Sequence, residues 1–296
     1  MRTLILFALV GLGAQLVDGS LGMAYGVTST TLLLAVGASP AAASATVHLA
    51  EIGTTLVSGA SHWKFGNVDW RVVAKIGIPG GVGAFAGATF LSSLDTSVAA
   101  PLMSGILLVL GLYVLIRFTF RGLNKQNLGK PMRKRFLGPL GLVAGFVDAT
   151  GGGGWGPVVT PSLMTVTRHE PRKIVGTTNA AEFVVAVSVS CGFLISGTAH
   201  QDIPWLPVLG LVLGGVAVAP YAARLTSRLP HAPMGAMVGG LIVLVNSVAV
   251  LGTVADLPLW LDLTLMAGWV GVVARVAWRA WQREQATTTE VVGSRT

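Results

Sequence analysis

Apolar stretches close to the length needed to cross a bilayer recur along this chain. Clear examples are residues 70–93, 98–118, 205–223 and 234–255, and a transmembrane helix needs about 20 predominantly apolar residues. The composition agrees, because only 11% of the 296 residues are charged, whereas soluble domains carry roughly 25%. No soluble domain fits between the apolar segments. We therefore expect an all-α integral membrane protein.

Charge and motifs exclude several other classes of protein. The net charge of +8 comes from short basic clusters between apolar segments, as the positive-inside rule expects, so we predict no nucleic-acid partner. The single Cys191 excludes an intrachain disulfide and a thiolate zinc cluster, and we expect it to be a small buried residue. The chain contains no Walker sequence, G-x-S-x-G elbow or H-E-x-x-H motif. We expect no enzymatic activity and no cofactor.

The chain contains an internal duplication. The segment GLGAQLVDGSLGMAYG (11–26) aligns with GLVAGFVDATGGGGWG (141–156) at an offset of 130. The aligned pairs include Asp18 with Asp148, Gly22 with Gly152, and Tyr25 with Trp155. After a one-residue insertion, an offset of 131 pairs Pro40 with Pro171, His48 with Asn179, and Glu51 with Glu182. Further along the chain, PGGVGA (79–84) aligns with LGGVAV (213–218), so three blocks recur in the same order in both halves.

Loop charges predict how the two copies are oriented. The basic linker between Arg117 and Arg135 should be cytoplasmic, and the next loop, TRHEPRK (167–173), is also basic. Segment 136–166 therefore enters and returns on the same side, and the same reasoning places its first-half equivalent on the opposite side. The copies are predicted to be inverted repeats, each with a Gly-broken helical hairpin and three transmembrane helices, which is a transporter architecture.

This scheme divides the chain into five parts and places the C-terminus in the cytoplasm, while the side of the N-terminus stays open. The parts are the first repeat 1–118, the basic linker 119–135, the second repeat 136–255, an extra transmembrane helix 256–281 and a cytoplasmic tail 282–296.

The hairpin arms look too short to span. Residues 4–17 and 137–148 would rise only about 20 Å as helix, against a hydrocarbon core of about 30 Å. We expect a tight reversal at glycines with positive φ, followed by a second half-helix whose free N–H groups favour an anion. The alternative is that the glycines only let helices pack closely, and we prefer it for Gly80-Gly81 and Gly214-Gly215. The predicted substrate-binding residues at the tips are Gly22, Met23, Tyr25, Gly152, Gly153, Gly154 and Trp155.

Ionisable residues lie deep in the predicted spans. Glu51 and Glu182 are about ten residues into their helices, where a carboxylate is costly and therefore functional by default or held neutral. The first of these helices has one polar face, made of Ser44, His48, Glu51, Thr55 and Ser58. We add His48 and Asn179 to the predicted substrate-binding residues. The candidates for proton coupling are Glu51, Glu182, Asp18 and Asp148, and the alternative for these groups is hydrogen bonding between helices.

The same residues have two further candidate roles, helix capping and metal binding. Asp18 and Asp148 precede the tip glycines, and we favour capping of the second half-helices over direct proton transfer. His48 and Glu51 have metal-ligand spacing, but the equivalent of His48 is Asn179 and no further ligand cluster occurs. We therefore expect no metal site.

The two duplicated glycine segments, each followed by a proline and a polar-faced helix, carry a family resemblance. The chain resembles the sulfite exporter (TauE/SafE) family of bacterial membrane permeases over about residues 5–285. Its first block departs from the family pattern, with Asp18-Gly-Ser-Leu-Gly22 where a richer glycine run is usual. The resemblance implies transport of small sulfur-containing anions such as sulfite, sulfonates or sulfoacetate across the bacterial cytoplasmic (inner) membrane, commonly as export.

The sequence therefore predicts a secondary transporter of a small sulfur-containing anion that works by alternating access about the two hairpins and is coupled to protons. An anion channel, a transporter of another small organic anion, and a membrane enzyme or assembly factor are the alternatives. The expected partners are the anionic substrate and membrane lipid, and self-association into a homo-oligomer stays open.

Overall fold

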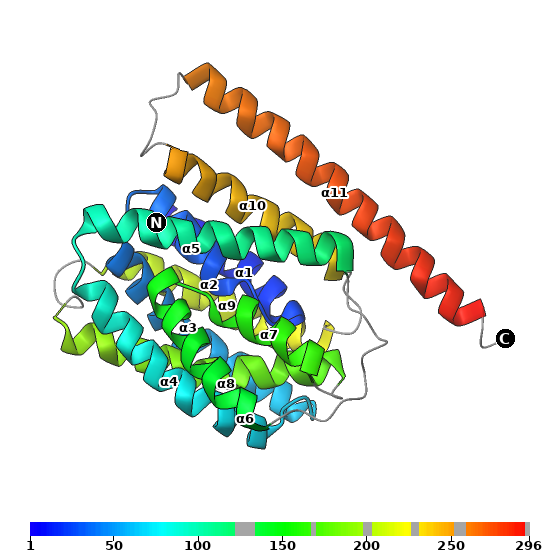
Figure 1. Ribbon diagram of the computed structural model, residues 1–296, viewed down its shortest axis with the longest axis horizontal. Coiled ribbons are helices and arrows are strands. Elements are labelled where there is room, and N and C mark those ends of the chain that lie inside the picture. Colours follow the sequence, from blue (N-terminus) through cyan, green and yellow to red (C-terminus); the bar gives the residue numbers. More distant parts are fainter. Residues whose placement is uncertain (122–133, 167–169, 198–202, 226–230, 252–258, 294–296) are drawn as a thin grey trace.

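The computed structural model describes residues 1–121, 134–166, 170–197, 203–225, 231–251 and 259–293. Within these ranges every regular element is helical, as expected from the sequence (Figure 1). Five helices are long and apolar enough to cross a membrane, judged by length and composition. The helices are α1 (Arg2–Leu21), α2 (Tyr25–Ala35), α3 (Pro40–Lys64), α4 (Trp70–Ser92), α5 (Thr96–Ile116), the short η1 (Arg117–Arg121), α6 (Lys134–Gly151), α7 (Trp155–Val166), α8 (Pro171–Ile195), α9 (Trp205–Leu225), α10 (His231–Leu251) and α11 (Leu259–Gly293).

Equivalent prolines start the two polar helices. α3 begins at Pro40 and α8 begins at Pro171. Proline suits the first helical position because its missing N–H would be unpaired there anyway. In α3 the preceding Ser39 side chain accepts a hydrogen bond from the Ala42 N–H at 3.4 Å, which caps the helix.

The arms of both hairpins are longer than expected. α1 has 20 residues and α6 has 18, which correspond to about 30 Å and about 27 Å of helix. The prediction of arms ending at residues 17 and 148 is wrong, because each helix continues through its aspartate to the glycine turn. The chain then reverses within three residues, 22–24 in the first hairpin and 152–154 in the second.

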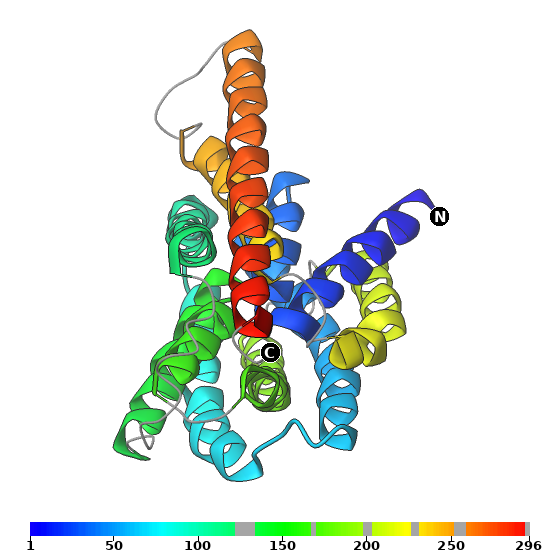
Figure 2. The same ribbon diagram turned by 90° about the vertical axis from the view of Figure 1, so that its right-hand side faces the viewer.

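Each arm packs along a helix of the other half. α1 lies beside α9, and α6 lies beside α4 (Figure 2). A Cβ on Gly214 would meet the Ala8 carbonyl oxygen at 1.8 Å, and one on Gly145 would meet the Gly80 carbonyl oxygen at 2.0 Å. Only glycine allows backbones to approach this closely, so small residues hold the two cross-repeat pairs together.

The remaining helices complete the bundle. α3 packs against α8 and α9, α4 against α8, and α5 against α10. At the edge of the molecule, α11 lies beside α10 (Figure 1). It continues to Gly293, so the segment from residue 282 that we predicted as a tail is helical as far as that glycine.

Two other expectations concern the exposure of Cys191 and the basic segments between helices. Cys191 is exposed on α8 rather than buried, because it lies on the side of the helix that faces away from the bundle. The basic linker at 122–133 and the loop at 167–169 lie outside the described residues. The prediction of orientation from loop charge therefore stays a prediction.

Candidate functional site

The tips of the two broken hairpins meet inside the bundle. Gly22 and Gly152 both adopt left-handed backbone, with φ of 69° and 68°. A Cβ added to Gly153 would lie 2.2 Å from the carbonyl carbon of Gly26. Backbone from the α6–α7 turn is therefore in direct contact with the start of α2. All predicted tip residues, including Met23, Gly154 and Trp155, are buried there.

A pair of matched hydrogen bonds joins the tips. The Thr30 hydroxyl donates to the Gly152 carbonyl oxygen, and the Thr160 hydroxyl donates to the Gly22 carbonyl oxygen. Both threonines are fully buried. Neither threonine was predicted from the sequence, although the two are separated by the same offset of 130 as the tip glycines.

Each aspartate before a tip caps the helix after it. The Oδ1 atom of Asp148 accepts from the N–H groups of Gly154 at 2.7 Å and Trp155 at 2.9 Å, and its carbonyl oxygen accepts from Gly153. In the first hairpin, Asp18 Oδ1 accepts from the Tyr25 N–H at a longer 3.5 Å.

This capping changes what the tips offer to a ligand. The expectation of free backbone donors is wrong for Gly153, Gly154 and Trp155, because the nearby Asp148 takes their hydrogens. In the described part of the first tip, the N–H groups of Met23 and Ala24 have no acceptor within hydrogen-bond distance. The free donors are therefore at the tip with fewer glycines.

The two tip aromatics are fixed by hydrogen bonds. The Trp155 indole N–H donates to the Thr178 carbonyl oxygen at 3.2 Å, and the Tyr25 hydroxyl donates to the Leu211 carbonyl oxygen at 3.0 Å. Both rings are almost fully buried. Each aromatic thus links its tip to a helix of the second half.

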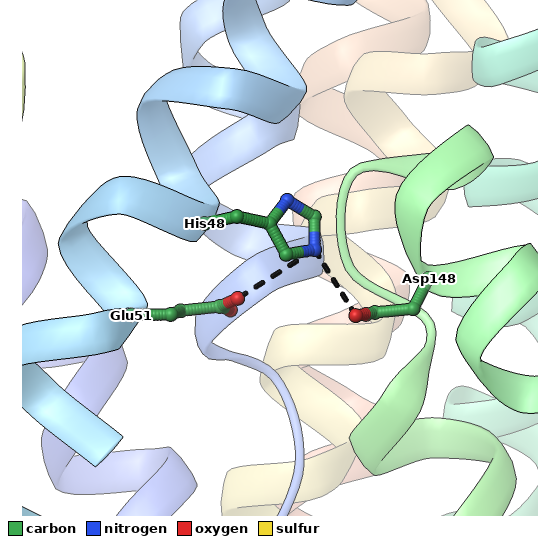
Figure 3. Close-up of side chains that lie close together, drawn as sticks. All are labelled: His48, Glu51 and Asp148. Carbon is green, nitrogen blue, oxygen red and sulfur yellow. Dashed lines mark hydrogen bonds and ion pairs between the residues drawn. The ribbon is translucent and has the colours of Figure 1, made fainter. Parts of the chain in front are cut away.

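The polar face of α3 is buried against α6 and α8. Its Ser44 hydroxyl donates to the Ala149 carbonyl oxygen at 2.8 Å, and its Ser58 hydroxyl donates to Asn179 Oδ1 at 2.7 Å. Between them, His48 Nε2 lies 3.0 Å from Asp148 Oδ2 and 3.7 Å from Glu51 Oε2 (Figure 3). The structure therefore brings His48, Glu51 and Asp148 together from the two halves of the chain.

Four carboxyl groups gather in this region. Asp18, Glu51, Asp148 and Glu182 are each at least 96% buried, and they lie close enough to influence one another electrostatically. Neither oxygen of Glu51 has a hydrogen-bond partner among the described residues. The buried polar residues that the structure describes include no lysine or arginine. Among the described residues, the group of possible positive charge that contacts these carboxyl groups is the imidazole of His48.

The cluster also bears on the expectation that no further donor group joins His48 and Glu51. That expectation is wrong, because one donor atom from each of His48, Glu51 and Asp148 lies within 4.8 Å of the others. The contact of 3.0 Å between His48 and Asp148 has the length of a direct hydrogen bond. We describe the group by that hydrogen bond.

Comparison with known proteins shows the family of the chain. The family model described as sulfite exporter TauE/SafE matches residues 7–248. The chain belongs to the sulfite exporter TauE/SafE family. The match covers both hairpins, α3 and α8, and it ends before α11. No solved structure matched the chain.

Curated members of related sequence are named as transporters. The chain is 55% identical over 250 residues to the probable membrane transporter protein YtnM of Bacillus subtilis, with 83% of this chain and 82% of that protein covered. It is 27% identical over 187 residues to the probable membrane transporter protein YdhB of the same organism, covering 62% of this chain and 74% of YdhB. This TauE/SafE protein is thus a multi-pass membrane transporter by family and by relatives.

Proposed function

We propose that this protein is a secondary transporter of a small sulfur-containing anion of the sulfite, sulfonate or sulfoacetate type, that it exports this anion, and that it is coupled to protons. The observation that carries the proposal is the meeting of two interrupted hairpins at a buried polar centre. Broken helices that meet inside a bundle form the substrate site in many secondary transporters. The family description supplies the class of anion.

We include inverted repeats in the proposal, because contacts recur in matched pairs. Thr30 bonds to the tip glycine of the second half, and Thr160 bonds to the tip glycine of the first half. Asp18 and Asp148 cap equivalent half-helices. Reciprocal contacts of this kind are expected when two similar units are related by a two-fold axis.

The anion would bind where donors face the cluster. We assign to it the unpaired amides of Met23 and Ala24. The predicted substrate-binding residues His48 and Asn179 already have hydrogen-bond partners, so either would bind the anion only by exchanging one of them. The glycines at the tips provide room for close approach, and Tyr25 and Trp155 fix the two tips in place. This assignment replaces the predicted cradle at the second tip by one centred on the first.

Proton coupling follows from the charge of the site. Two like charges 4 Å apart repel by about 4 kcal/mol at an effective dielectric constant of about 20. An anion can therefore approach Asp18, Glu51, Asp148 and Glu182 only when some of these carboxyl groups carry protons. Binding of the anion and binding of protons would then favour each other.

We place the protein in the bacterial cytoplasmic membrane, with the basic linker and the C-terminus in the cytoplasm. Short basic segments between spans support this orientation. The family match supports a membrane location.

The direct test uses purified protein in proteoliposomes. Uptake of labelled sulfite should saturate, should be accelerated by unlabelled sulfite on the opposite side, and should be competed by sulfonates or sulfoacetate more strongly than by carboxylates. A conductance that shows neither saturation nor exchange would indicate the alternative, an anion channel. Stronger competition by carboxylates would indicate a transporter of another small organic anion.

A further inference from the structure

The hydrogen bonds of His48 determine where its protons lie. Its Nδ1 atom is 2.7 Å from the Ser44 carbonyl oxygen, and a carbonyl oxygen can only accept. The Ser44 hydroxyl is 3.3 Å from the same nitrogen, but it donates to the Ala149 carbonyl oxygen at 2.8 Å. We therefore assign the Nδ1 position as protonated, with its hydrogen directed at the Ser44 carbonyl oxygen.

The other ring nitrogen faces a carboxyl group. His48 Nε2 is 3.0 Å from Asp148 Oδ2. A hydrogen bond at this distance needs one proton, which is carried either by the imidazole or by the carboxyl group. Without that proton, two lone pairs would face each other in a buried site. The contact therefore requires one proton that can be exchanged.

This contact joins two separate parts of the fold. His48 belongs to α3 of the first half, and Asp148 belongs to the last turn of α6 in the second half (Figure 3). The other carboxylate oxygen of Asp148 holds the amides of Gly154 and Trp155. A proton at His48 thus holds α3 against the tip that starts α7.

The equivalent contact in the other half has no such proton. Asn179 takes the place of His48, and its side chain faces Asp18. Its Oδ1 atom accepts from the Ser58 hydroxyl at 2.7 Å, and its amide nitrogen donates one hydrogen to the Val175 carbonyl oxygen at 3.3 Å, which leaves the second hydrogen for Asp18. An amide N–H donates to a carboxylate without gaining or losing a proton. One of the two matched contacts is therefore permanent, while the other can be switched.

The groups around His48 fit this role. The ionisable side chains that face it or its partners are Glu51 on α3, Asp148 on α6, Asp18 on α1, Glu182 on α8 and the Tyr25 phenol on α2. Glu51 Oε2 is 3.7 Å from Nε2 and has no hydrogen-bond partner of its own. After Asp148 itself, Glu51 is the carboxyl group closest to Nε2 among the described residues, so it can take the proton from His48. The imidazole then stays neutral with its hydrogen on Nδ1.

We propose that the contact between His48 and Asp148 is the proton-binding site of this transporter. One proton held between Nε2 and Oδ2 closes α3 on the tip of the second hairpin, and its transfer to Glu51 lets the two separate. This inference rests on the proton-coupled transport proposed above, and it names the residues that perform the coupling.

The decisive variant is His48→Asn, because it gives the first half the side chain that the second half already has at Asn179. The assay uses proteoliposomes with a trapped pH-sensitive dye. If the wild-type protein moves one proton with each anion, a difference of one pH unit across the membrane should let it accumulate sulfite up to about 10-fold, because one pH unit is a tenfold ratio of proton concentrations. In His48→Asn, any sulfite flux that remains should carry no proton and should not respond to the pH gradient. The matched control is His62→Asn, which changes another buried histidine of α3, one that bonds to the Gly19 carbonyl oxygen at 3.2 Å. It should keep the coupling of the wild type.

A second measurement does not depend on transport. Hydrogen exchange of the peptide covering residues 148–156, corrected for the intrinsic effect of pH, should show protection that falls as rising pH removes the proton. In His48→Asn the protection should not change with pH. Proton-coupled flux in His48→Asn, pH-independent protection in the wild type, or a stoichiometric metal ion that only the wild type retains would each overturn the inference. A wild-type protein that moves no sulfite, but whose tip responds to pH through His48, would refute the proposed function alone.

Discussion

The reversal at Gly153 is the position where one added methyl group should perturb the site most. Gly153 has a φ of 142°, a conformation that L-residues with side chains rarely adopt. A Cβ there would lie 2.2 Å from the Gly26 carbonyl carbon and 2.3 Å from the Val27 backbone nitrogen. Backbone atoms cannot move aside as the end of a side chain can. In Gly153→Ala the two tips must therefore separate.

The expected cost can be worked out from these contacts. The unfavourable backbone conformation costs about 1–3 kcal/mol, and ordinary contact requires the tips to move apart by about 1 Å. Such a movement strains the hydrogen bonds of Thr30 and Thr160 across the interface, which contribute about 1 kcal/mol each. We expect a total loss of about 4 kcal/mol. For a chain of this size that lowers Tm by about 10 °C.

The assay compares Gly153→Ala with Gly138→Ala in the same detergent and lipid. Gly138 is in α6, and a Cβ there meets nothing within 4 Å, so alanine should leave stability unchanged or raise it by up to about 1 kcal/mol. Thermal unfolding and sulfite flux are measured on both variants. If Gly153→Ala keeps both the sulfite flux of the wild type and its Tm to within about 2 °C, then the contact between the tips contributes less to stability and transport than the structure indicates.

Two further predictions concern the contacts between the halves and their orientation. Thr30→Val and Thr160→Val should each lower stability by about 1–3 kcal/mol, because each leaves a buried carbonyl oxygen unpaired; thermal unfolding should show similar losses, and a loss confined to one variant would argue against matched roles. In a cysteine-free Cys191→Ala background, Val36→Cys and Glu170→Cys should react with an impermeant maleimide from opposite sides of the membrane, because they follow equivalent hairpins of inverted repeats. Labelling from the same side would contradict the inverted arrangement.

Hydrophobic length, proline and repeat offset were enough to predict the helices of this fold. The start of α3 at Pro40 and of α8 at Pro171 agrees with the duplicated prolines. The ends of the arms were not predictable in this way, because each helix continues up to the turn glycines, and where it ends depends on hydrogen bonds formed in the folded turn. Asp148 stays in the helix since its side chain reaches forward to Gly154 and Trp155.

The sequence predicted several residues that gather at the buried centre, but not all of the hydrogen bonds between them. Sequence spacing placed Glu51 and His48 on one face of a helix, and both are buried together in the structure. Capping of the second half-helices by Asp18 and Asp148 was predicted and is confirmed. The sequence did not predict that the Asp148 cap would use the backbone donors of Gly154 and Trp155 that we had assigned to the substrate, since that depends on the geometry of the turn. Thr30 and Thr160 were missed because a buried threonine in an apolar helix looks ordinary until its equivalent is aligned with it.

The differences in sequence between the two halves bear directly on how a proton gradient could drive transport by this protein. If the repeats are inverted and identical, the inward-facing and outward-facing states are related by a two-fold rotation about an axis in the membrane plane and have the same free energy, so nothing favours a direction. The contacts that hold the tips together keep this equivalence, as the bonds of Thr30 and Thr160 show. The exchange of Asn179 for His48 breaks it at a position that can bind a proton. A proton bound there would stabilise one state over the other by an amount that depends on pH, which is what coupling to a proton gradient requires.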